Sequence, residues 1–323
     1  MFVCVAATHV LVHAPAKLNL FLEVLGRRPD GFHEIETLMG AVSIFDTLEF
    51  APRTEGELRL SCRWAGGIGA RNKRREPSGD VASATTRDAV GDLPQGEQNL
   101  VYRAVARLRD RCAVTGGADI RLHKRIPSAA GLGGASSDAA AALVAANAAW
   151  KLGCSPAQLA ELAAELGSDI PFFLAGGFAI CRGRGEQIES IRGSRFHAVV
   201  ARPPVGLSTA DVYRRWRPGT PRGDVRRLQT SLAAGDWRTA KQRLVNGLQE
   251  SATGLTPWVG RLTAALARLG CQAGQMSGSG SSCFGICRSA RHARRLAAQL
   301  RSLNLGEVFQ TTSSANGKRP QRE

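Results

Sequence analysis

The feature of this chain that most constrains its fold is a glycine-rich segment that leads directly into an alanine-rich stretch. Residues 127–138 read PSAAGLGGASSD, and a helical pattern continues from about residue 137 to 151. Glycines at 131, 133 and 134 permit positive φ angles and let the backbone approach a bulky anion closely. The serines stand where the helix begins, and the unpaired N–H groups and dipole of that end favour phosphate. The segment therefore predicts a phosphate-binding loop at the start of a long helix.

A glycine turn followed by a serine N-cap is also a common structural feature that needs no ligand. The length of this segment and its place before a long helix favour phosphate binding over that alternative. The segment matches neither Gly-x-x-x-x-Gly-Lys-Ser nor Gly-x-Gly-x-x-Gly, so a P-loop and a dinucleotide fold are both disfavoured. We expect the nucleotide to contact Pro127, Ala129, Ala130, Gly131, Leu132, Gly133, Gly134, Ala135, Ser136 and Ser137.

The order of the expected elements indicates an α+β fold. Strands are expected at 10–24 with an interruption at 14–16, and at 35–50, 118–123, 178–181, 197–201, 284–287 and 308–312. Residues 273–280 are expected to form a strand that runs into a second glycine-rich loop. Helices are expected at 101–112, 137–151, 156–166, 237–251, 258–269 and 291–303. A doubly wound sheet needs regular βαβ units. The early block of strands argues against such a sheet.

Composition changes sharply between residues 66 and 96, where Gly, Arg, Ser, Asp and Thr replace large apolar residues. We interpret this stretch as a flexible insertion or a long surface loop. The domain prediction is an N-terminal lobe over residues 1–175, which carries the glycine-rich loop, and a C-terminal lobe over 176–312. The polar tail over 313–323 is expected to be disordered.

The cysteines and the apolar pattern predict a cytoplasmic protein. The 8 cysteines are scattered without a Cys-x-x-Cys pair, and Cys283 and Cys287 lack the rest of a zinc set. We expect free thiols in a reducing compartment, with these two as small packing residues. No run approaches the ~20 apolar residues of a transmembrane helix, and the first residues lack the basic region of a signal peptide. We therefore expect no membrane association.

The formal net charge of +16 leaves two interpretations open. One is nucleic-acid binding through phosphate contacts, and the other is a basic surface around a smaller pocket for anionic substrates. The basic residues are spread along the chain, and aromatic residues make up only 6% of it. A single-strand binding face needs aromatic residues beside basic ones. We expect no specific nucleic-acid partner and only salt-sensitive, adventitious binding.

Three separated motifs resemble those of the GHMP kinase superfamily and occur in the same order. Residues 15–20 read PAKLNL, residues 131–143 read GLGGASSDAAAAL after Ile126-Pro127, and residues 276–285 read MSGSGSSCFG. The resemblance frames nearly the whole chain. It implies a two-lobed GHMP kinase fold in which ATP and an alcohol meet in the cleft between the lobes. Mg²⁺ is implied with ATP, and Ser136 is a candidate to contact it or a phosphate. Because Mg²⁺ keeps several waters and relies on ATP oxygens, we expect no dedicated metal site in the chain.

The resemblance implies that Lys17 and Asp169 carry out the transfer. Asp169 lies in LGSDIPFF, which is similar to the segment bearing the catalytic aspartate, and Lys17 matches the lysine of the first motif. A carboxylate within reach can take the proton of the attacking hydroxyl, and an ammonium can neutralise growing negative charge. Without the resemblance, Asp169 would be read as a helix N-cap before Pro171, and Lys17 as a surface residue. Whether Asp169 acts as a base or mainly orients the substrate stays open.

Residues 26–39, GRRPDGFHEIETLM, are similar to the segment that holds the cytidine end of the substrate in one branch of the superfamily. That branch phosphorylates the 2-hydroxyl of a cytidine diphosphate-linked methylerythritol in the non-mevalonate isoprenoid route. A flat base needs an aromatic face and edge hydrogen bonds, which Phe32 and His33 would supply. The ordinary alternative for His33 is a turn histidine without a ligand. The resemblance also implies substrate-binding roles for Asn19, Thr209, Tyr213, Ser277, Gly278 and Gly280, with Tyr213 over the second face of the cytosine.

Three departures from the resemblance leave alternatives open. Residues 66–96 look like an insertion, Phe32 stands where many relatives carry Tyr, and Gln98 stands where relatives often carry Asp. One alternative is another GHMP kinase that acts on a sugar, homoserine or a mevalonate-type alcohol. Another is a catalytically silent binding protein with the GHMP fold. The oligomeric state is not indicated by the sequence.

Overall fold

The structure is a computed structural model, and it describes residues 1–65, 93–219, 223–271 and 273–313. Most of the predicted insertion, residues 66–92, and the tail from residue 314 lie outside the described residues. The first residue of the predicted tail, Ser313, is described and buried, and its hydroxyl accepts from the Phe196 N–H at 2.9 Å. Strands and helices are mixed along the chain, so the expected α+β class is confirmed.

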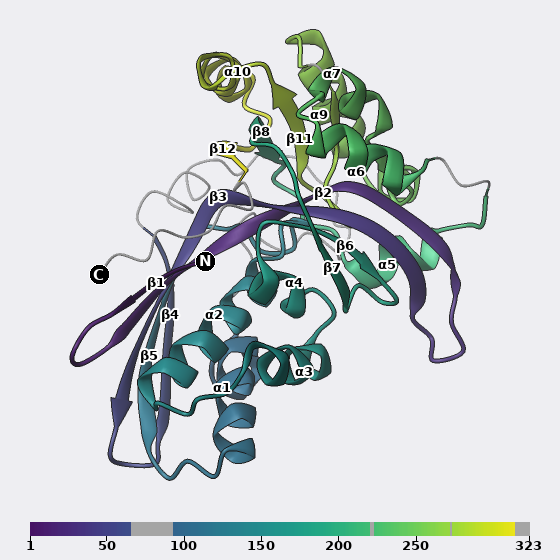
Figure 1. The fold of residues 1–323 in the computed structure, drawn as a ribbon. Coiled ribbons are helices and arrows are strands. Elements are labelled where there is room, and N and C mark those ends of the chain that lie inside the picture. The colour runs from purple at the N-terminus through teal and green to yellow at the C-terminus, as the bar shows by residue number, and fades with distance from the viewer. Residues whose placement is uncertain (66–92, 220–222, 272, 314–323) are drawn as a thin grey trace, which may run out of the picture.

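The larger sheet is built around one long antiparallel hairpin, which sweeps across the whole molecule as a curved ribbon (Figure 1). Within the described residues this sheet has eight strands in the order β1-β2-β3-β5-β4, with β6 and β9 added on β3 and β2 and β7 added on β6. The strands are β1 (Phe2–Val5), β2 (Val10–Arg27), β3 (His33–Arg53), β4 (Leu58–Trp64), β5 (Gly117–Lys124), β6 (Phe178–Arg182), β7 (Gln187–Ile191) and β9 (Val245–Asn246).

The smaller sheet comes from the C-terminal part of the chain. Among the described residues it has four antiparallel strands in the order β10-β11-β8-β12. Its strands are β8 (His197–Arg202), β10 (Gly274–Met276), β11 (Cys283–Cys287) and β12 (Glu307–Thr312). The end of β12 reaches β3, where the Ser43 hydroxyl lies 3.2 Å from that of Thr311. This contact joins the two sheets beside the centre of the molecule.

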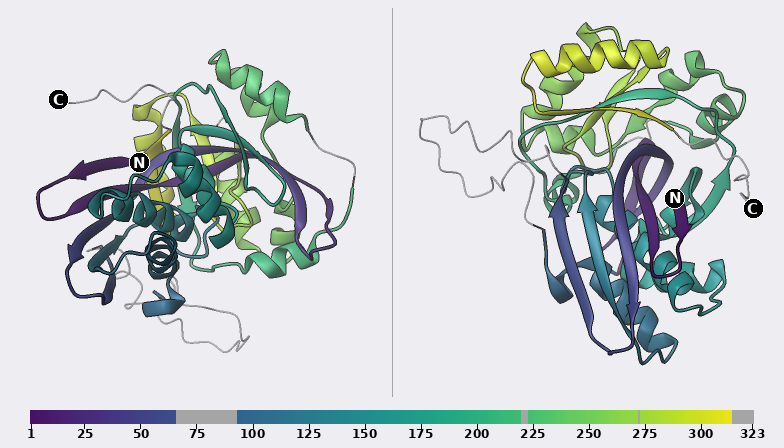
Figure 2. Two further views of the ribbon diagram at one scale, coloured as in Figure 1. Left: turned by 60° about the horizontal axis from the view of Figure 1, so that its bottom comes forward. Right: turned by 90° about the vertical axis from the view of Figure 1, so that its left-hand side faces the viewer.

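The helices cover the sheets in two groups (Figures 1 and 2). The first group lies against the larger sheet and comprises α1 (Leu100–Arg111), α2 (Gly134–Ala149), α3 (Pro156–Leu166) and α4 (Ile170–Ala175). The second group belongs to the C-terminal part and comprises α5 (Thr209–Arg215), α6 (Val225–Ala233), α7 (Trp237–Ala240), α8 (Gln249–Thr253), α9 (Trp258–Arg268) and α10 (Ala290–Ser302). Short 3₁₀ turns occupy η2 (Gly96–Gln98) and η3 (Lys241–Arg243).

Helix α2 is the central helix, and its alanines explain its position. It packs on β2 and β3 and also on α1 and α4, so it is buried on nearly every side. Methyl side chains let backbones approach closely, whereas a helix with one solvated face would need an amphipathic pattern. The neighbouring α3 shows the usual start signals, with Pro156 in its first turn and a reciprocal capping box between Ser155 and Gln158. The core under the larger sheet therefore fixes the start of α2, where the glycine-rich loop ends.

Two sequence-based expectations about elements are wrong. Strand β2 is not interrupted at residues 14–16, because Pro15 lies at a bulge where the pairing with β3 shifts by two residues, from Phe45 to Val42. The expected helix over 237–251 is divided into α7, η3, β9 and α8. The expected strand that runs into a second glycine-rich loop over 273–280 is confirmed, because β10 ends at Met276 and a turn follows. The division of the chain after residue 175 stays a prediction; β6 and β7 lie beyond it and continue the larger sheet.

None of the helices in the described part of the chain is both long enough and apolar enough to cross a bilayer.

Candidate active site

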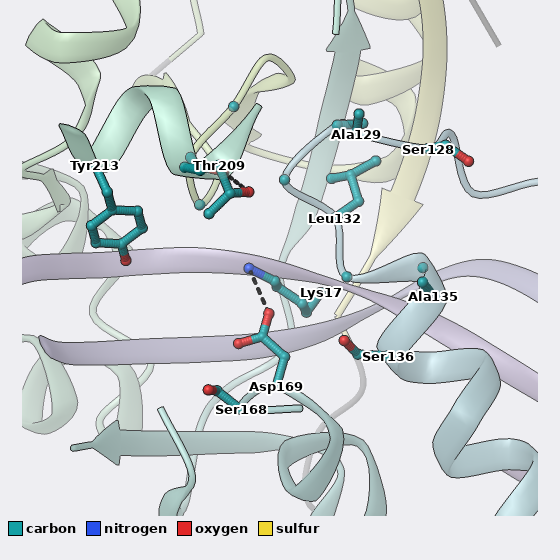
Figure 3. A pocket seen from close by; sticks show the side chains of 18 of the residues that line it. Lys17, Ser128, Ala129, Leu132, Ala135, Ser136, Ser168, Asp169, Thr209 and Tyr213 are labelled. Atoms are coloured by element: carbon teal, nitrogen blue, oxygen red, sulfur yellow. Dashed lines mark hydrogen bonds and ion pairs between the residues drawn. The ribbon is translucent and has the colours of Figure 1, made fainter. Parts of the chain in front are cut away.

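A cavity of about 1160 Å³ lies where the three motifs of residues 15–20, 131–143 and 276–285 meet. Its walls come from β2, β3, the glycine-rich loop, the start of α2, the residues before α4, and α5. Figure 3 shows the loop and Ser136 on one side and Thr209 and Tyr213 on the other, with Lys17 and Asp169 between them. The charged pair therefore stands between the loop side and the aromatic side of the cavity (Figure 3).

Lys17 and Asp169 face each other as the sequence predicts. Lys17 projects from β2 with only 4% of its surface exposed, and its Nζ lies 3.6 Å from Asp169 Oδ2 (Figure 3). Asp169 stands at the N-cap position of α4, but its side chain accepts no capping hydrogen bond. The carboxylate is therefore directed into the cavity instead of satisfying the helix end. An ammonium and a free carboxylate at this separation can together handle a hydroxyl proton and developing negative charge.

Asn19 fixes the lysine from the same strand. The Lys17 ammonium donates to Asn19 Oδ1, and Asn19 Nδ2 donates to Thr37 Oγ1 at 2.8 Å. Thr37 in turn donates to the Phe21 carbonyl at 2.6 Å. Lys17, Asn19 and Thr37 are all buried, so these hydrogen bonds set the position of the ammonium from the β2–β3 hairpin. Thr37 lines the cavity and was not singled out by the sequence analysis, although it lies in the quoted 26–39 segment.

The glycine-rich loop is held by both neighbouring motifs. The Lys17 N–H donates to the Leu132 carbonyl at 3.0 Å, and the Ser282 N–H donates to the Ala130 carbonyl at 3.2 Å. At Gly131, where φ is +71°, a Cβ would lie 2.0 Å from the Ser277 carbonyl oxygen. Only glycine fits this close approach. The loop is therefore preformed, and its backbone faces the cavity.

The turn after β10 supports the loop and contributes to the wall. The Ser277 hydroxyl donates to the Gly131 carbonyl at 2.9 Å and accepts from the Asn19 N–H at 3.2 Å. Ser277 is completely buried and does not line the cavity, whereas Gly278 and Gly280 do. The Ser279 hydroxyl lies 2.9 Å from that of Thr209, which joins this turn to α5. Ser277 is thus placed to brace the loop.

Aromatic side chains gather at one end of the cavity. The His33 and Tyr213 rings are in contact, with centroids 4.9 Å apart, and the Trp216 ring meets His33 edge-on at 5.7 Å. Because His33 and Tyr213 already touch, a flat ligand that bonds to His33 would meet the edge of its ring. Phe32 is 51% exposed, and the Arg184 guanidinium lies over one face of its ring at 4.9 Å. The other face of Phe32 is open to a base.

Two ionisable groups at this end are kept neutral by their surroundings. Burial, assisted by the charge of Arg27, lowers the pKa of His33 below its ordinary value. Burial and, to a smaller extent, the charge of Asp169 raise the pKa of the Tyr213 hydroxyl. A neutral imidazole has one donor and one acceptor nitrogen, and a neutral phenol can donate. These groups are suited to reading the edge of an uncharged base.

The opposite end of the cavity lies beside α1. It is lined by Cys62, Leu93, Pro94, Gln98, Asn99, Leu100 and Leu122. Both polar atoms of the Asn99 side chain are engaged, because its Oδ1 caps α1 at Val101 and its Nδ2 donates to the Pro94 carbonyl at 2.8 Å. Burial raises the pKa of the Cys62 thiol to about 11, so it stays protonated at neutral pH. This end is a mostly apolar slot of the kind that holds a nucleobase.

The structure brings most of the predicted site residues to one cavity. Those that line it are Lys17, Asn19, Phe32, His33, Pro127, Ala129, Ala130, Gly131, Leu132, Gly133, Gly134, Ala135, Ser136, Asp169, Thr209, Tyr213, Gly278 and Gly280. Ser137 and Ser277 are buried behind the wall. Trp216 and Arg184 were not predicted. Trp216 follows Tyr213 by three residues and could have been found from that helical spacing, whereas nothing in the sequence placed Arg184 against Phe32.

The fold and the site define a small-molecule kinase of the GHMP class. Residues 99–177 match the family model for the GHMP kinases N terminal domain, and residues 228–304 match the model for GHMP kinases C terminal.

Individual relatives identify the branch of the superfamily to which the chain belongs. The 4-diphosphocytidyl-2-C-methyl-D-erythritol kinase of Pelotomaculum thermopropionicum is 41% identical over 291 residues, which cover 89% of this chain and 92% of the relative. The enzyme of the same name from Exiguobacterium sibiricum is 36% identical, over 93% of this chain and 96% of its own length. A crystal structure of 4-(cytidine 5'-diphospho)-2C-methyl-D-erythritol kinase is similar with a TM-score of 0.74 and 34% identity, over 95% of this chain and 100% of that one. The chain belongs to the 4-diphosphocytidyl-2-C-methyl-D-erythritol kinase family.

Proposed function

We propose that this chain transfers the γ-phosphoryl group of ATP to the 2-hydroxyl of 4-diphosphocytidyl-2-C-methyl-D-erythritol, a step of the non-mevalonate route to isoprenoids. The observation that carries the proposal is the Lys17–Asp169 pair, 3.6 Å apart at the middle of a cavity with a glycine-rich loop at one side and aromatic rings at one end. The relatives at 36–41% identity bear the name of this activity.

In this function the two ligands enter the cavity from opposite ends. The adenine occupies the slot beside α1, and the phosphates lie along the glycine-rich loop at the head of α2, where free N–H groups favour anions. The cytidine end of the acceptor lies among Phe32, His33 and Tyr213. The methylerythritol hydroxyl then meets the terminal phosphate beside Asp169, which accepts its proton, while Lys17 offsets the charge that develops.

Magnesium is part of the proposal as the companion of ATP. In the described part of the chain no group of three or more His, Cys, Asp or Glu side chains gathers as a metal site. The oxygen-bearing side chains that line the cavity near the loop include the Ser136 hydroxyl and the carboxylates of Asp138 and Asp169, and oxygen ligands are what Mg²⁺ takes. These residues fit an ion that is held mainly by ATP and water. Bound there, Mg²⁺ would neutralise phosphate charge.

The test is ADP release by the purified protein with Mg-ATP, with and without the proposed acceptor. Substrate-dependent release, together with a product heavier by one phosphate in mass spectrometry, supports the proposal. A panel of homoserine, mevalonate and sugar alcohols is the control. If folded protein that binds an ATP analogue phosphorylates one of those and not the cytidine-linked alcohol, the acceptor assignment is wrong.

We also propose a cytosolic location. All eight cysteines are free thiols in the structure, and the sulfurs of Cys112 and Cys154 lie 3.6 Å apart without a disulfide bond. Exposed and half-buried thiols this close persist in a reducing compartment. Fractionation of the producing cell with an antibody to the chain tests this location.

A further inference from the structure

Three buried charged residues lie behind the glycine-rich loop, away from the transfer pair. Asp46 on β3, Lys124 at the end of β5 and Asp138 on α2 are each no more than 4% exposed. The Lys124 ammonium donates to Asp46 and, at 2.5 Å, to Asp138 Oδ2. None of the three touches Asp169 in the described contacts. The sequence analysis did not single them out.

The three residues tie down both ends of the loop. Asp46 Oδ1 accepts the backbone N–H groups of Arg125 and, at 2.8 Å, of Ile126, which directly precede the loop. Lys124 links the same Asp46 to Asp138, which lies in the second turn of α2, just after the loop. One carboxylate therefore holds the entry of the loop, and its ammonium partner holds the exit.

The electrostatics of these three residues indicate that they contribute little to the stability of the fold. Burying charges costs free energy that a buried ion pair often fails to recover, and apolar replacements of similar volume are commonly neutral or better. Here one ammonium serves two carboxylates, and burial raises the pKa of Asp138 well above its ordinary value. Asp138 Oδ1 has no hydrogen-bond partner among the described residues. Burial alone would lower the pKa of Lys124, but the two carboxylates outweigh it and raise that pKa. Because burying these three charges costs free energy, we infer that they serve to position the loop.

We propose that Asp46, Lys124 and Asp138 are positioning residues that hold the glycine-rich loop in the geometry that receives the phosphates of ATP. The proposal rests on the proposed function for the identity of the donor. Lys124 and Asp138 line the cavity, so they also border the nucleotide, but Asp46 does not line it. A substitution of Asp46 can therefore change the affinity for ATP only by changing the conformation of the loop.

The test compares Asp46→Asn with a control on the same pair of strands. An asparagine has one side-chain oxygen, so it cannot accept the two backbone N–H groups and the ammonium as well. Glu49→Gln is the control, because Glu49 pairs with Arg121 across the same β3–β5 ladder at 2.9 Å on the exposed surface. We expect the KM for ATP to rise by about tenfold or more in Asp46→Asn, with the KM for the acceptor within about twofold of the wild type. The control should leave both unchanged.

A binding measurement separates positioning from general damage. Calorimetric titration should show weaker binding of an ATP analogue to Asp46→Asn but unchanged binding of adenosine, which has no phosphates. Equal losses for both ligands, or no loss for the ATP analogue, would overturn the proposal. Should Asp46→Asn fail to fold, Asp46→Glu carries the same test, since it keeps the charge but displaces the carboxylate oxygen that accepts the two N–H groups at the entry of the loop. The titrations need no acceptor, so they remain decisive even if the acceptor assignment fails.

Discussion

At the scale of single residues, the site depends on Asp169 standing at a helix start without capping it. Its carboxylate lies 3.6 Å from the buried Lys17 ammonium and is free of other described hydrogen bonds within α4. We predict that Asp169→Asn, which keeps the shape but not the basicity, lowers kcat by ~10²–10⁴-fold with little change in the KM for ATP. Steady-state kinetics on protein with native circular dichroism checks this.

The pH profile of the same variant tells a base from an orienting group. If Asp169 accepts the proton, the acid limb of the wild-type kcat profile belongs to it and disappears in Asp169→Asn. If the variant is slow but keeps the acid limb, the carboxylate mainly orients the substrate. Wild-type turnover in the folded variant would remove Asp169 from the mechanism.

Two glycines with the same backbone conformation give a matched pair at this scale. Gly131 and Gly153 have φ of +71° and +68°, but an added Cβ at Gly153 meets nothing within 4 Å. Gly153→Ala should therefore show only the left-handed backbone penalty, about 1–2 kcal/mol in the free energy of unfolding, with unchanged kinetics. Gly131→Ala must also displace the Ser277 carbonyl, so it should lose ATP binding. Chemical denaturation and ATP-analogue titration of both variants test this, and equal behaviour of the two would contradict the close approach at Gly131.

At the scale of elements, one carboxylate joins three of them. Glu189 on β7 accepts from Arg226 on α6 at 2.5 and 2.8 Å and from Arg182 on β6 at 2.9 Å. These hydrogen bonds, first from Arg226 and then from Arg182, lower the pKa of Glu189 to about 2. Since the folded pKa lies below the ordinary value of 4.5, the contribution is complete above that value and is lost as the pH falls from 4.5 toward 2.

We therefore predict a small, pH-dependent effect of Glu189→Gln. Because these groups are more than a third exposed, solvent screening limits the loss in unfolding free energy at neutral pH to less than about 1 kcal/mol. The difference between wild type and variant should shrink toward zero as the pH is lowered below the ordinary glutamate range. Urea denaturation over that range measures it. A difference that stays constant with pH would mean that the ion pairs do not act as the geometry indicates.

Elements that depend on local sequence could be predicted, and elements that depend on distant partners could not. The α2 helix and its loop belong to the first kind, because they follow from local composition. The expected 237–251 helix failed because Val245 and Asn246 pair with β2, and the Asn246 amide bonds to the Met276 and Gly278 carbonyls. Helical periodicity cannot reveal such partners, since they come from distant strands. Likewise the Asp46–Lys124 contact joins residues 78 positions apart, and no local pattern marks it.

At the scale of the whole molecule, the charge distribution separates adventitious binding from function. The chain carries a formal charge of +16, and Arg27, Arg184, Arg214 and Arg217 line the substrate end of the cavity. Exposed charges are screened over ~10 Å at 0.1 M salt, whereas groups inside a partly buried cavity are screened much less. The surface charge should therefore attract any polyanion, while recognition of the two substrates should depend on the cavity.

We predict that duplex DNAs of unrelated sequence bind this protein with the same Kd at low salt. If about six phosphates are contacted, their affinity should fall by ~10³-fold between about 50 and 200 mM salt. The affinity for an ATP analogue should fall much less over the same range, and the analogue should not displace the DNA. Fluorescence anisotropy with labelled duplexes, with and without the analogue, measures both. A sequence preference together with displacement by the ATP analogue would instead place nucleic acid in the cavity, and the basic surface would then belong to the function of the site.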